Sequence, residues 1–190
     1  MKVRKFLFAG ALIAASLFSV NSVMAESTPT NSSTATVNII FTPIQTIVVN
    51  PDQKTVDFVY NSIDNYNDGA GPITKNDHLT INSSGPFEVN VTGTDFTGGI
   101  AGKTIFASEI AVLVEKGTNN NISTYGTFSL LALATTSQVL INSATEGGMG
   151  LNFNVTYSNP GGANGNSFKG YVDGAEKTYT ANVEYAIIAK

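Results

Sequence analysis

Residues 34–43 read Thr-Ala-Thr-Val-Asn-Ile-Ile-Phe-Thr-Pro, and apolar side chains fall at every second position of this stretch. Successive side chains of a β-strand point to opposite faces, so this period of two predicts a strand with one apolar face. A polar tail, residues 26–33, precedes the stretch, and Pro43 interrupts it. Such a strand can pair within its own domain, or it can be added to a neighbouring copy of the chain. The apolar positions are Ala35, Val37, Ile39 and Phe41.

The rest of the chain repeats this pattern. Short alternating runs are separated by clusters of Gly, Asn, Pro and Asp, which is typical of an all-β sandwich or barrel. We therefore expect an all-β, immunoglobulin-like sandwich of short antiparallel strands, closed by its own N-terminal strand or completed by a donor strand from a neighbouring subunit. Long loops are expected at residues 61–77 and 159–174. The expected strands are residues 44–49, 55–60, 78–81, 87–91, 110–114, 128–134, 139–141, 151–157 and 178–189.

The first 25 residues have the pattern of a cleaved secretion signal. Lys2, Arg4 and Lys5 precede a short apolar run, and Val23-Met24-Ala25 matches a small-residue cleavage site. The apolar run is shorter than the roughly 20 residues that span a bilayer. We expect residues 1–25 to be removed, residues 26–43 to form a tail with a candidate donor strand, and residues 44–190 to form the sandwich domain. The signal therefore predicts a secreted protein.

Charge and cysteine content narrow the function classes. Three of the ten basic residues lie in the first 25 residues, while all fourteen acidic residues follow them, so the mature chain carries a formal charge of −7. An acidic chain does not favour nucleic acids or anionic membranes as partners, and we expect no membrane insertion after signal cleavage. The chain has no cysteine, so its stability must come from the core and from backbone pairing rather than from disulfides.

The sequence predicts neither an enzyme nor a cofactor. The one histidine, His78, directly follows Asp77, and adjacent strand residues face opposite ways, so a Ser-His-Asp triad is not expected and His78 is predicted at a loop edge. A cysteine nucleophile is excluded. The stretch Asp64–Gly69 resembles a calcium loop, but Tyr66 and Lys75 occupy positions that need oxygen ligands, so no metal site is expected.

Taken together, these features resemble the major subunits of chaperone–usher pili, in particular the cysteine-free, colonisation-factor type. The resemblance rests on a cleaved signal, a polar tail, the Ala35-x-Val37-x-Ile39-x-Phe41-x-Pro43 stretch and a second apolar run directly after it. A Gly-rich segment at residues 161–174 and a long alternating last run complete the layout, which spans the mature chain. Many such pilins have an aromatic residue at or beside the C-terminus, whereas the last aromatic residue here is Tyr185.

The resemblance implies a structural subunit of a bacterial surface fibre that supports adhesion or biofilm formation. It also implies the location: the periplasm in transit, then the cell surface or a fimbrium. Its partners would be other copies of itself, forming a homopolymer, together with a periplasmic chaperone and an outer-membrane usher. Residues 35–41 would act as the donor strand. The last strand would bind the chaperone and line the acceptor groove, with Val183, Tyr185 and Ile187 as its inward residues.

Two other hypotheses remain open from the residues. In one, residues 35–41 form the ordinary first strand of a closed monomeric sandwich. In the other, the chain is a monomeric secreted binding module for a carbohydrate or surface ligand, with function on its loops. Tyr66 and Tyr171 are the loop contacts expected in that case, although tryptophan is absent and the sequence predicts no clustered aromatic platform.

Overall fold

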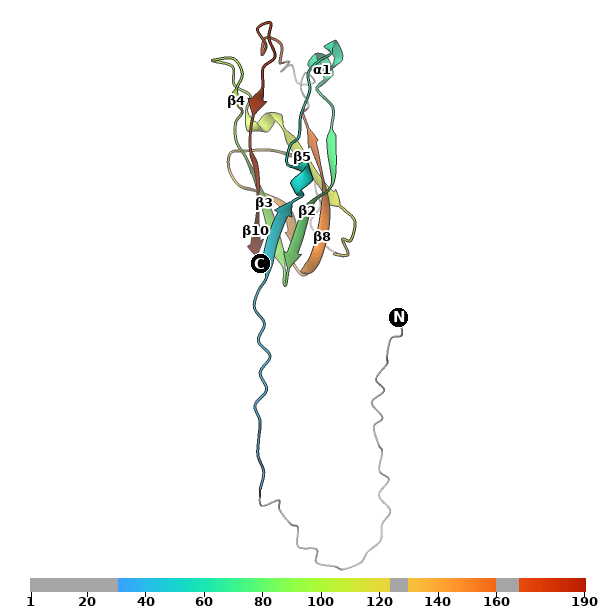
Figure 1. The fold of residues 1–190 in the computed structure, drawn as a ribbon, viewed down its shortest axis with the longest axis vertical. Helices are drawn as coiled ribbons and strands as arrows, with labels where there is room; N and C mark the ends of the chain where they lie inside the picture. Colours follow the sequence, from blue (N-terminus) through green and yellow to red (C-terminus); the bar gives the residue numbers. More distant parts are fainter. Residues whose placement is uncertain (1–30, 124–129, 160–167) are drawn as a thin grey trace, which may run out of the picture. The chain divides into compact units, whose positions relative to one another are not determined.

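The computed structural model describes residues 31–123, 130–159 and 168–190. The chain divides into two units, residues 1–40 and 41–190. The second unit contains all the strands that the structure describes, and its two larger sheets are built from antiparallel pairs (Figure 1). The predicted all-β sandwich is confirmed.

One sheet has five strands and the other has three. The five-stranded sheet has the order β1-β2-β8-β5-β6, the three-stranded sheet has the order β10-β3-β7, and β4 pairs with β9 apart from them. The strands are β1 (Gln45–Val49), β2 (Ile73–Ser83), β3 (Phe87–Gly93), β4 (Thr97–Gly98), β5 (Ala111–Lys116), β6 (Leu131–Ala132), β7 (Gln138–Ser143), β8 (Gly148–Ser158), β9 (Tyr179–Thr180) and β10 (Val183–Ala189). The short helices are η1 (Pro51–Gln53), α1 (Ile63–Asp68) and η2 (Ala107–Glu109).

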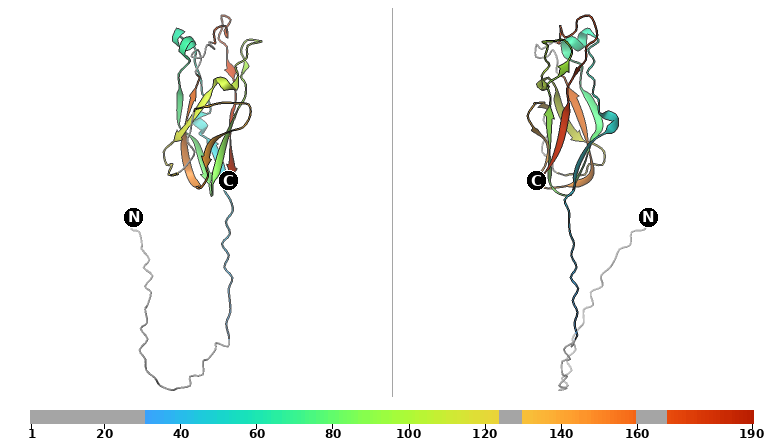
Figure 2. Two further views of the ribbon diagram at one scale, coloured as in Figure 1. Left: turned by 180° about the vertical axis from the view of Figure 1, so that it is seen from behind. Right: turned by 60° about the vertical axis from the view of Figure 1, so that its left-hand side comes forward.

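Alternating side chains build the core between the two large sheets. On β8, Leu151, Phe153 and Val155 are fully buried, while Asn152 and Asn154 between them are partly exposed. On β3, Phe87, Val89 and Val91 are buried in the same way from the opposite sheet. Figure 2 shows the two curved layers from behind and from the side. Burial of these apolar side chains is the main source of stability in a domain without disulfides.

The structure corrects several predicted boundaries. The predicted loop 61–77 contains α1, and β2 already begins at Ile73. The predicted strand 55–60 keeps its alternation, but it is not a strand, because no described strand pairs with it. The predicted strand 178–189 is divided into β9 and β10 by residues 181–182. Residues 128–129 of the predicted strand 128–134 lie outside the described residues.

A bulge in β2 turns His78 into the core. Lys75 pairs with Val155 and Leu79 pairs with Phe153, so the three residues 76–78 of β2 lie opposite the single residue Asn154 of β8. Asp77 has a φ of 50° within this bulge. His78 is consequently only 2% exposed, and the prediction that it lies at a loop edge is wrong. An alternating strand pattern could not reveal this, because a bulge breaks the alternation locally.

The bulge is fixed by the turn after β5. The Asp77 carboxylate accepts hydrogen bonds from the Thr118 amide at 2.8 Å and from the Thr118 hydroxyl at 2.6 Å, and the Asp77 amide donates to Asn154 Oδ1 at 2.8 Å. Gly117 lies directly against this contact. A β-carbon at Gly117 would collide with the Asp77 carboxylate and lie 3.0 Å from the backbone of Asn152.

Gly117→Ala is therefore expected to lower the free energy of unfolding by about 1–3 kcal/mol, the usual effect of overpacking. Urea unfolding of the monomer, followed by circular dichroism, measures this change. Gly85→Ala is the matched control, because a β-carbon at Gly85 would meet no atom within 4 Å. Equal stability of the two variants would contradict the prediction.

Candidate functional site: an open seam between the first and last strands

Two strand edges that lack a neighbour meet on one side of the domain. β1 is the outermost strand of the five-stranded sheet, β10 is the outermost strand of the three-stranded sheet, and the two strands approach each other. After η1 the chain continues as the extended segment Thr55–Tyr60, which has no strand partner among the described residues. We call the space bordered by β1 and residues 55–60 on one side and by β9 and β10 on the other the open seam.

The side chains that line the seam are apolar and only partly covered. Val56 and Phe58 pack against the core from residues 55–60, while Asp57 and Val59 between them are exposed. On the opposite edge, Val183, Tyr185 and Ile187 of β10 also pack against the core and remain partly exposed. The predicted acceptor residues therefore lie together on the seam side of the last strand.

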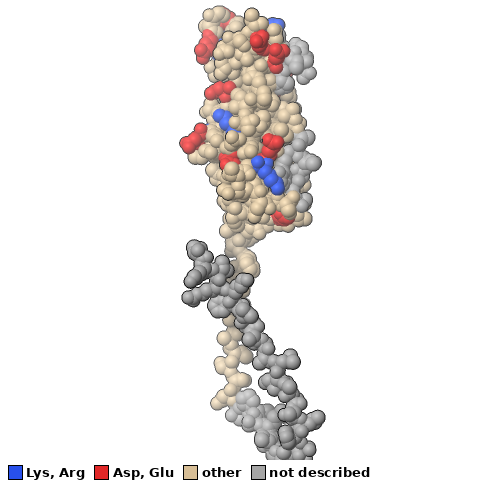
Figure 3. Space-filling model, turned by 90° about the vertical axis from the view of Figure 1, so that its right-hand side faces the viewer, with Lys and Arg blue, Asp and Glu red and all other residues tan. Residues whose placement is uncertain are grey.

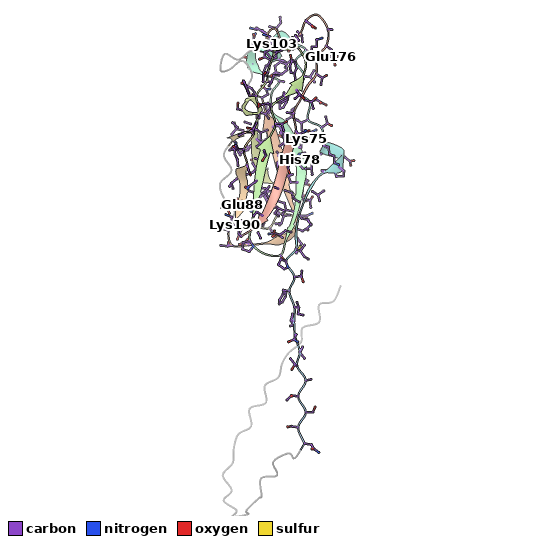
Figure 4. All side chains as sticks on the ribbon, turned by 90° about the vertical axis from the view of Figure 1, so that its left-hand side faces the viewer. Lys75, His78, Glu88, Lys103, Glu176 and Lys190 are labelled. Carbon is purple, nitrogen blue, oxygen red and sulfur yellow. The ribbon has the colours of Figure 1, made fainter. Side chains whose placement is uncertain are left out.

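The ends of the seam differ. At one end, which we call the C-terminal pole, Lys190 forms an ion pair with Glu88 at 2.6 Å (Figure 4). β1 also begins at this pole. The residue before it, Ile44, and the last residue, Lys190, both bind the turn 84–86 between β2 and β3: the Ile44 amide donates to Ser84 Oγ, and the Lys190 amide donates to the Pro86 carbonyl. The opposite end, the α1 pole, contains α1, Lys103 and Glu176 (Figures 1 and 4). β10 runs from the α1 pole toward the C-terminal pole.

Toward the α1 pole the seam widens into a cavity of about 700 Å³, which we call the edge pocket. Residues 56–61 line one side and residues 174–179 line the other. Both loop tyrosines singled out from the sequence, Tyr66 and Tyr171, also line it. The structure therefore brings the two predicted loop contacts into one cavity.

Aromatic rings form a continuous cluster around the edge pocket, so the prediction that the chain has no clustered aromatic platform is wrong. Neighbouring ring centroids lie 5.3–5.7 Å apart, and the Lys103 ammonium lies 5.3 Å from the centroid of Tyr171. The cluster could not be predicted from the sequence, because its members come from four separate segments. In order of contact the rings are Tyr66, Tyr60, Phe168, Tyr171 and Tyr179.

Tyr60 has a hydroxyl group that is buried and makes no hydrogen bond of normal geometry. Burial raises the pKa of Tyr60, and the Ala70 backbone amide opposes this with a smaller effect. An amide can only donate to the hydroxyl oxygen, so the hydroxyl proton has no acceptor.

Beneath the middle of the seam, a chain of hydrogen bonds crosses from one edge to the other. His78 Nδ1 lies 3.2 Å from Gln53 Oε1, and His78 Nε2 lies 2.8 Å from the Tyr157 hydroxyl. The Tyr157 hydroxyl lies 2.6 Å from that of Tyr185. Gln53 is the last residue of η1, shortly before the segment 55–60, while Tyr185 is on β10. We call these four side chains the cross-seam chain.

The hydrogen bonds of the cross-seam chain all have the same direction, from Tyr185 toward Gln53. Gln53 Nε2 donates to the Asn76 carbonyl, so Oε1 faces His78 and must accept from Nδ1–H. The neutral imidazole then accepts at Nε2 from the Tyr157 hydroxyl, which leaves the Tyr157 oxygen to accept from Tyr185. The Tyr185 proton therefore points away from the seam.

Burial shifts the pKa of each titratable member. It raises the pKa of Tyr157 to about 12, against a smaller lowering by the hydrogen bond from Tyr185. Burial also raises the pKa of Tyr185, and proximity to Tyr157 adds to the increase. The pKa of His78 is lowered by burial and by the charge of Lys75. All three groups are therefore neutral at pH 7.

The predicted donor segment is exposed. Residues 31–40 of the first unit have no secondary structure, and Val37 and Ile39 are 85% and 78% exposed. Phe41, at the start of the second unit, is 89% exposed. Among the described residues the first strand is β1, which begins at Gln45.

The described surface has few charged side chains on one of its faces, where they are separated by uncharged surface (Figure 3). No group of three or more metal-ligating side chains occurs in the described ranges. Within the same ranges, no helix is long and apolar enough to cross a membrane.

Comparisons with known proteins give no family assignment. No protein-family model matches the chain. No curated protein matches it either.

Proposed function

We propose that the chain is a structural subunit of a bacterial surface fibre, in which the tail segment Ala35–Phe41 of one copy fills the open seam of the next. The observation that carries this proposal is the open seam itself. Two edges without a neighbour flank a row of partly exposed apolar side chains, which is the space that one further strand would fill. The chain also has an exposed segment with the matching alternation.

The dimensions of the two parts agree. A strand rises about 3.3 Å per residue, so residues 34–43 span about 33 Å. Residues 179–187 of the last edge span about 30 Å by the same rule. A ten-residue donor can therefore pair along the edge of β9 and β10 as far as Ile187, and its inward side chains can pack over Val183, Tyr185 and Ile187.

The energy available to such a pairing is large. Burial of Val37, Ile39 and Phe41 gives on the order of 4.5–9 kcal/mol as an upper bound, at about 1.5–3 kcal/mol for each side chain, and the Ala35 methyl group adds about 0.8 kcal/mol. Backbone hydrogen bonds add about 0.5–1.5 kcal/mol each. A typical domain has a stability of roughly 5–15 kcal/mol, so the inserted strand would contribute on the same scale as folding itself.

The arrangement of the poles sets the direction of the donor strand. The tail precedes β1, which begins at the C-terminal pole. In an open series of copies, the tail of one subunit enters the next from the α1 pole, which makes the donor antiparallel to β10 and places Phe41 closest to the edge pocket. Entry from the C-terminal pole would instead join two copies through identical contacts and give a closed dimer.

Export to the cell surface, with a periplasmic chaperone and an outer-membrane usher as assembly partners, is part of this proposal through the resemblance described above. A chaperone that supplied a temporary strand to the seam would protect its apolar side chains before assembly. No cofactor takes part in this function.

Size-exclusion chromatography and negative-stain microscopy of the secreted mature protein test the proposal, beside a version that lacks residues 26–41. We expect SDS-resistant oligomers or filaments from the full protein and a soluble, non-polymerising truncated protein. A stable monomer from the full protein, together with an unfolded truncation, would show that the tail belongs to its own domain.

A second candidate function rests on the edge pocket. Its volume lies within the range of small-molecule sites, and aromatic rings with a few polar groups are typical of such sites. The candidate is a monomeric secreted module that binds a carbohydrate or surface ligand through Tyr66 and Tyr171. Binding of the monomer to a glycan array, lost in Tyr171→Ala and with no filaments from the full protein, would favour this function over the fibre.

A further inference from the structure

We infer that the cross-seam chain is an acid-sensitive control of the open seam, which admits the donor strand while His78 is neutral and disfavours it once His78 is protonated. This inference rests on the proposed function of the seam. Two observations support it. The cross-seam chain joins the two edges of the seam beneath the place that the donor would occupy, and its hydrogen bonds can run in only one direction.

In the neutral form the chain leaves no polar group unsatisfied toward the donor. Tyr185 donates to Tyr157, Tyr157 donates to His78, and His78 donates to Gln53. The Tyr185 ring is then the only part of the residue that the donor needs to contact. An apolar side chain such as Ile39 can cover it without burying an unpaired donor.

Protonation of His78 reverses the outer part of the chain. Both ring nitrogens of an imidazolium donate, so Nε2–H must point at the Tyr157 oxygen. The Tyr157 proton then turns to the Tyr185 oxygen, and the Tyr185 proton turns outward. In an open seam water can accept that proton, whereas under an apolar donor strand it is buried without a partner, which is unfavourable.

The groups around His78 favour its neutral form at pH 7. Two titratable groups, Tyr157 from β8 and Tyr185 from β10, face His78, and η1 contributes the neutral Gln53. On β2 itself, the positive charge of Lys75 acts against protonation (Figure 4). The carboxylate of Asp77 is bound to Thr118 rather than to the imidazole.

The sign of the pH effect follows from linkage. The pKa of His78 already lies below its ordinary value in the open seam. An inserted donor lowers it further, because the outward Tyr185 proton that accompanies the cation loses its water acceptor. A group with a lower pKa in the bound form favours binding at high pH. Affinity for the donor is therefore full above the pKa of the open form and falls as pH drops through it. For one proton the loss is at most about tenfold per pH unit.

Fluorescence anisotropy with a labelled peptide of residues 33–43 tests this inference. The protein is the full mature chain with Ile39→Asp, so that its own tail does not compete. The measurement runs from pH 7.5 to pH 4.5. We expect the dissociation constant to stay constant at first and to rise once the pH falls below about 6.5, which is the ordinary pKa of histidine. Circular dichroism at each pH separates release of the peptide from unfolding.

Two variants with opposite effects make the test specific. His78→Gln keeps an acceptor for Tyr157 and a donor for Gln53 but does not titrate, so the ratio of dissociation constants at pH 5 and pH 7.5 should fall toward one. Gln53→Glu places a carboxylate against Nδ1, which raises the pKa of His78 and moves the loss of affinity to higher pH. Gln138→Glu on β7 adds the same charge to the other sheet and should leave the profile unchanged.

The outcomes separate this inference from the function on which it rests. Peptide binding at pH 7.5 with the same pH profile in the parent, His78→Gln and Gln53→Glu proteins would overturn the acid control and leave the fibre proposal intact. No peptide binding at any pH would overturn both. A shift with Gln138→Glu as large as that with Gln53→Glu would attribute the effect to net charge and also overturn the inference.

Discussion

Ile39→Asp is expected to abolish fibre formation by the mature protein while leaving its domain folded. In the proposed fibre, Ile39 is buried over the seam of a neighbouring copy, and a carboxylate there would lack any partner. The substitution removes about 1.5–3 kcal/mol of apolar burial and adds the penalty of burying a charge. A combined loss of even 4 kcal/mol weakens each junction about a thousandfold.

Asn38→Asp is the matched control for this prediction. It introduces the same carboxylate one position away, on the face of the tail strand that would point outward, so fibres should still form. Negative-stain microscopy and SDS-resistant oligomers on gels give the readout for both proteins, and circular dichroism confirms that both are folded. Normal fibres from Ile39→Asp, or equal loss from both variants, would contradict the donor role. Val37→Asp should behave as Ile39→Asp does.

The main features of the fold follow from local alternation of side chains. β8 could be predicted because its buried and exposed residues alternate strictly from Leu151 to Tyr157, and such a strand has only one way to face a core. The last strand could be predicted for the same reason. The break at residues 181–182 could not, because it arises where Asn182 exchanges hydrogen bonds with Thr94 from a distant segment.

The candidate site was only partly accessible to prediction. The alternation of Val183, Tyr185 and Ile187 indicated which side chains of the last strand point inward. In contrast, nothing local shows that residues 55–60 lack a strand partner, since pairing depends on elements far away in the chain. The cross-seam chain depends on a bulge that turns His78 inward and on residues as far apart in the sequence as Gln53 and Tyr185. Single-sequence patterns contain no such information.

The second large effect is expected from a mixture of two assembly-defective variants. Val183→Asp places a carboxylate on the seam side of β10, so that copy can donate its tail but cannot accept one. Ile39→Asp has the opposite defect, with an intact seam and a defective tail. Each protein alone should remain monomeric, and an equimolar mixture should form one-to-one dimers that extend no further, because only one junction in each pair is functional.

Size-exclusion chromatography with light scattering distinguishes these products, and a mass label on one variant establishes the one-to-one composition. Ala186→Asp is the matched control for Val183→Asp, because Ala186 is exposed on the outer side of the same strand. That protein should form fibres alone. Val56→Asp on the opposite edge provides a second acceptor-defective variant. Val183 and Val56 both pack against the core, so circular dichroism is used to confirm that each variant is folded. If mixtures with either acceptor variant contain only monomers, tail and seam do not act on each other between copies, and the fibre proposal fails. Dimers from both mixtures would show that the tail is the donor and the seam is its acceptor.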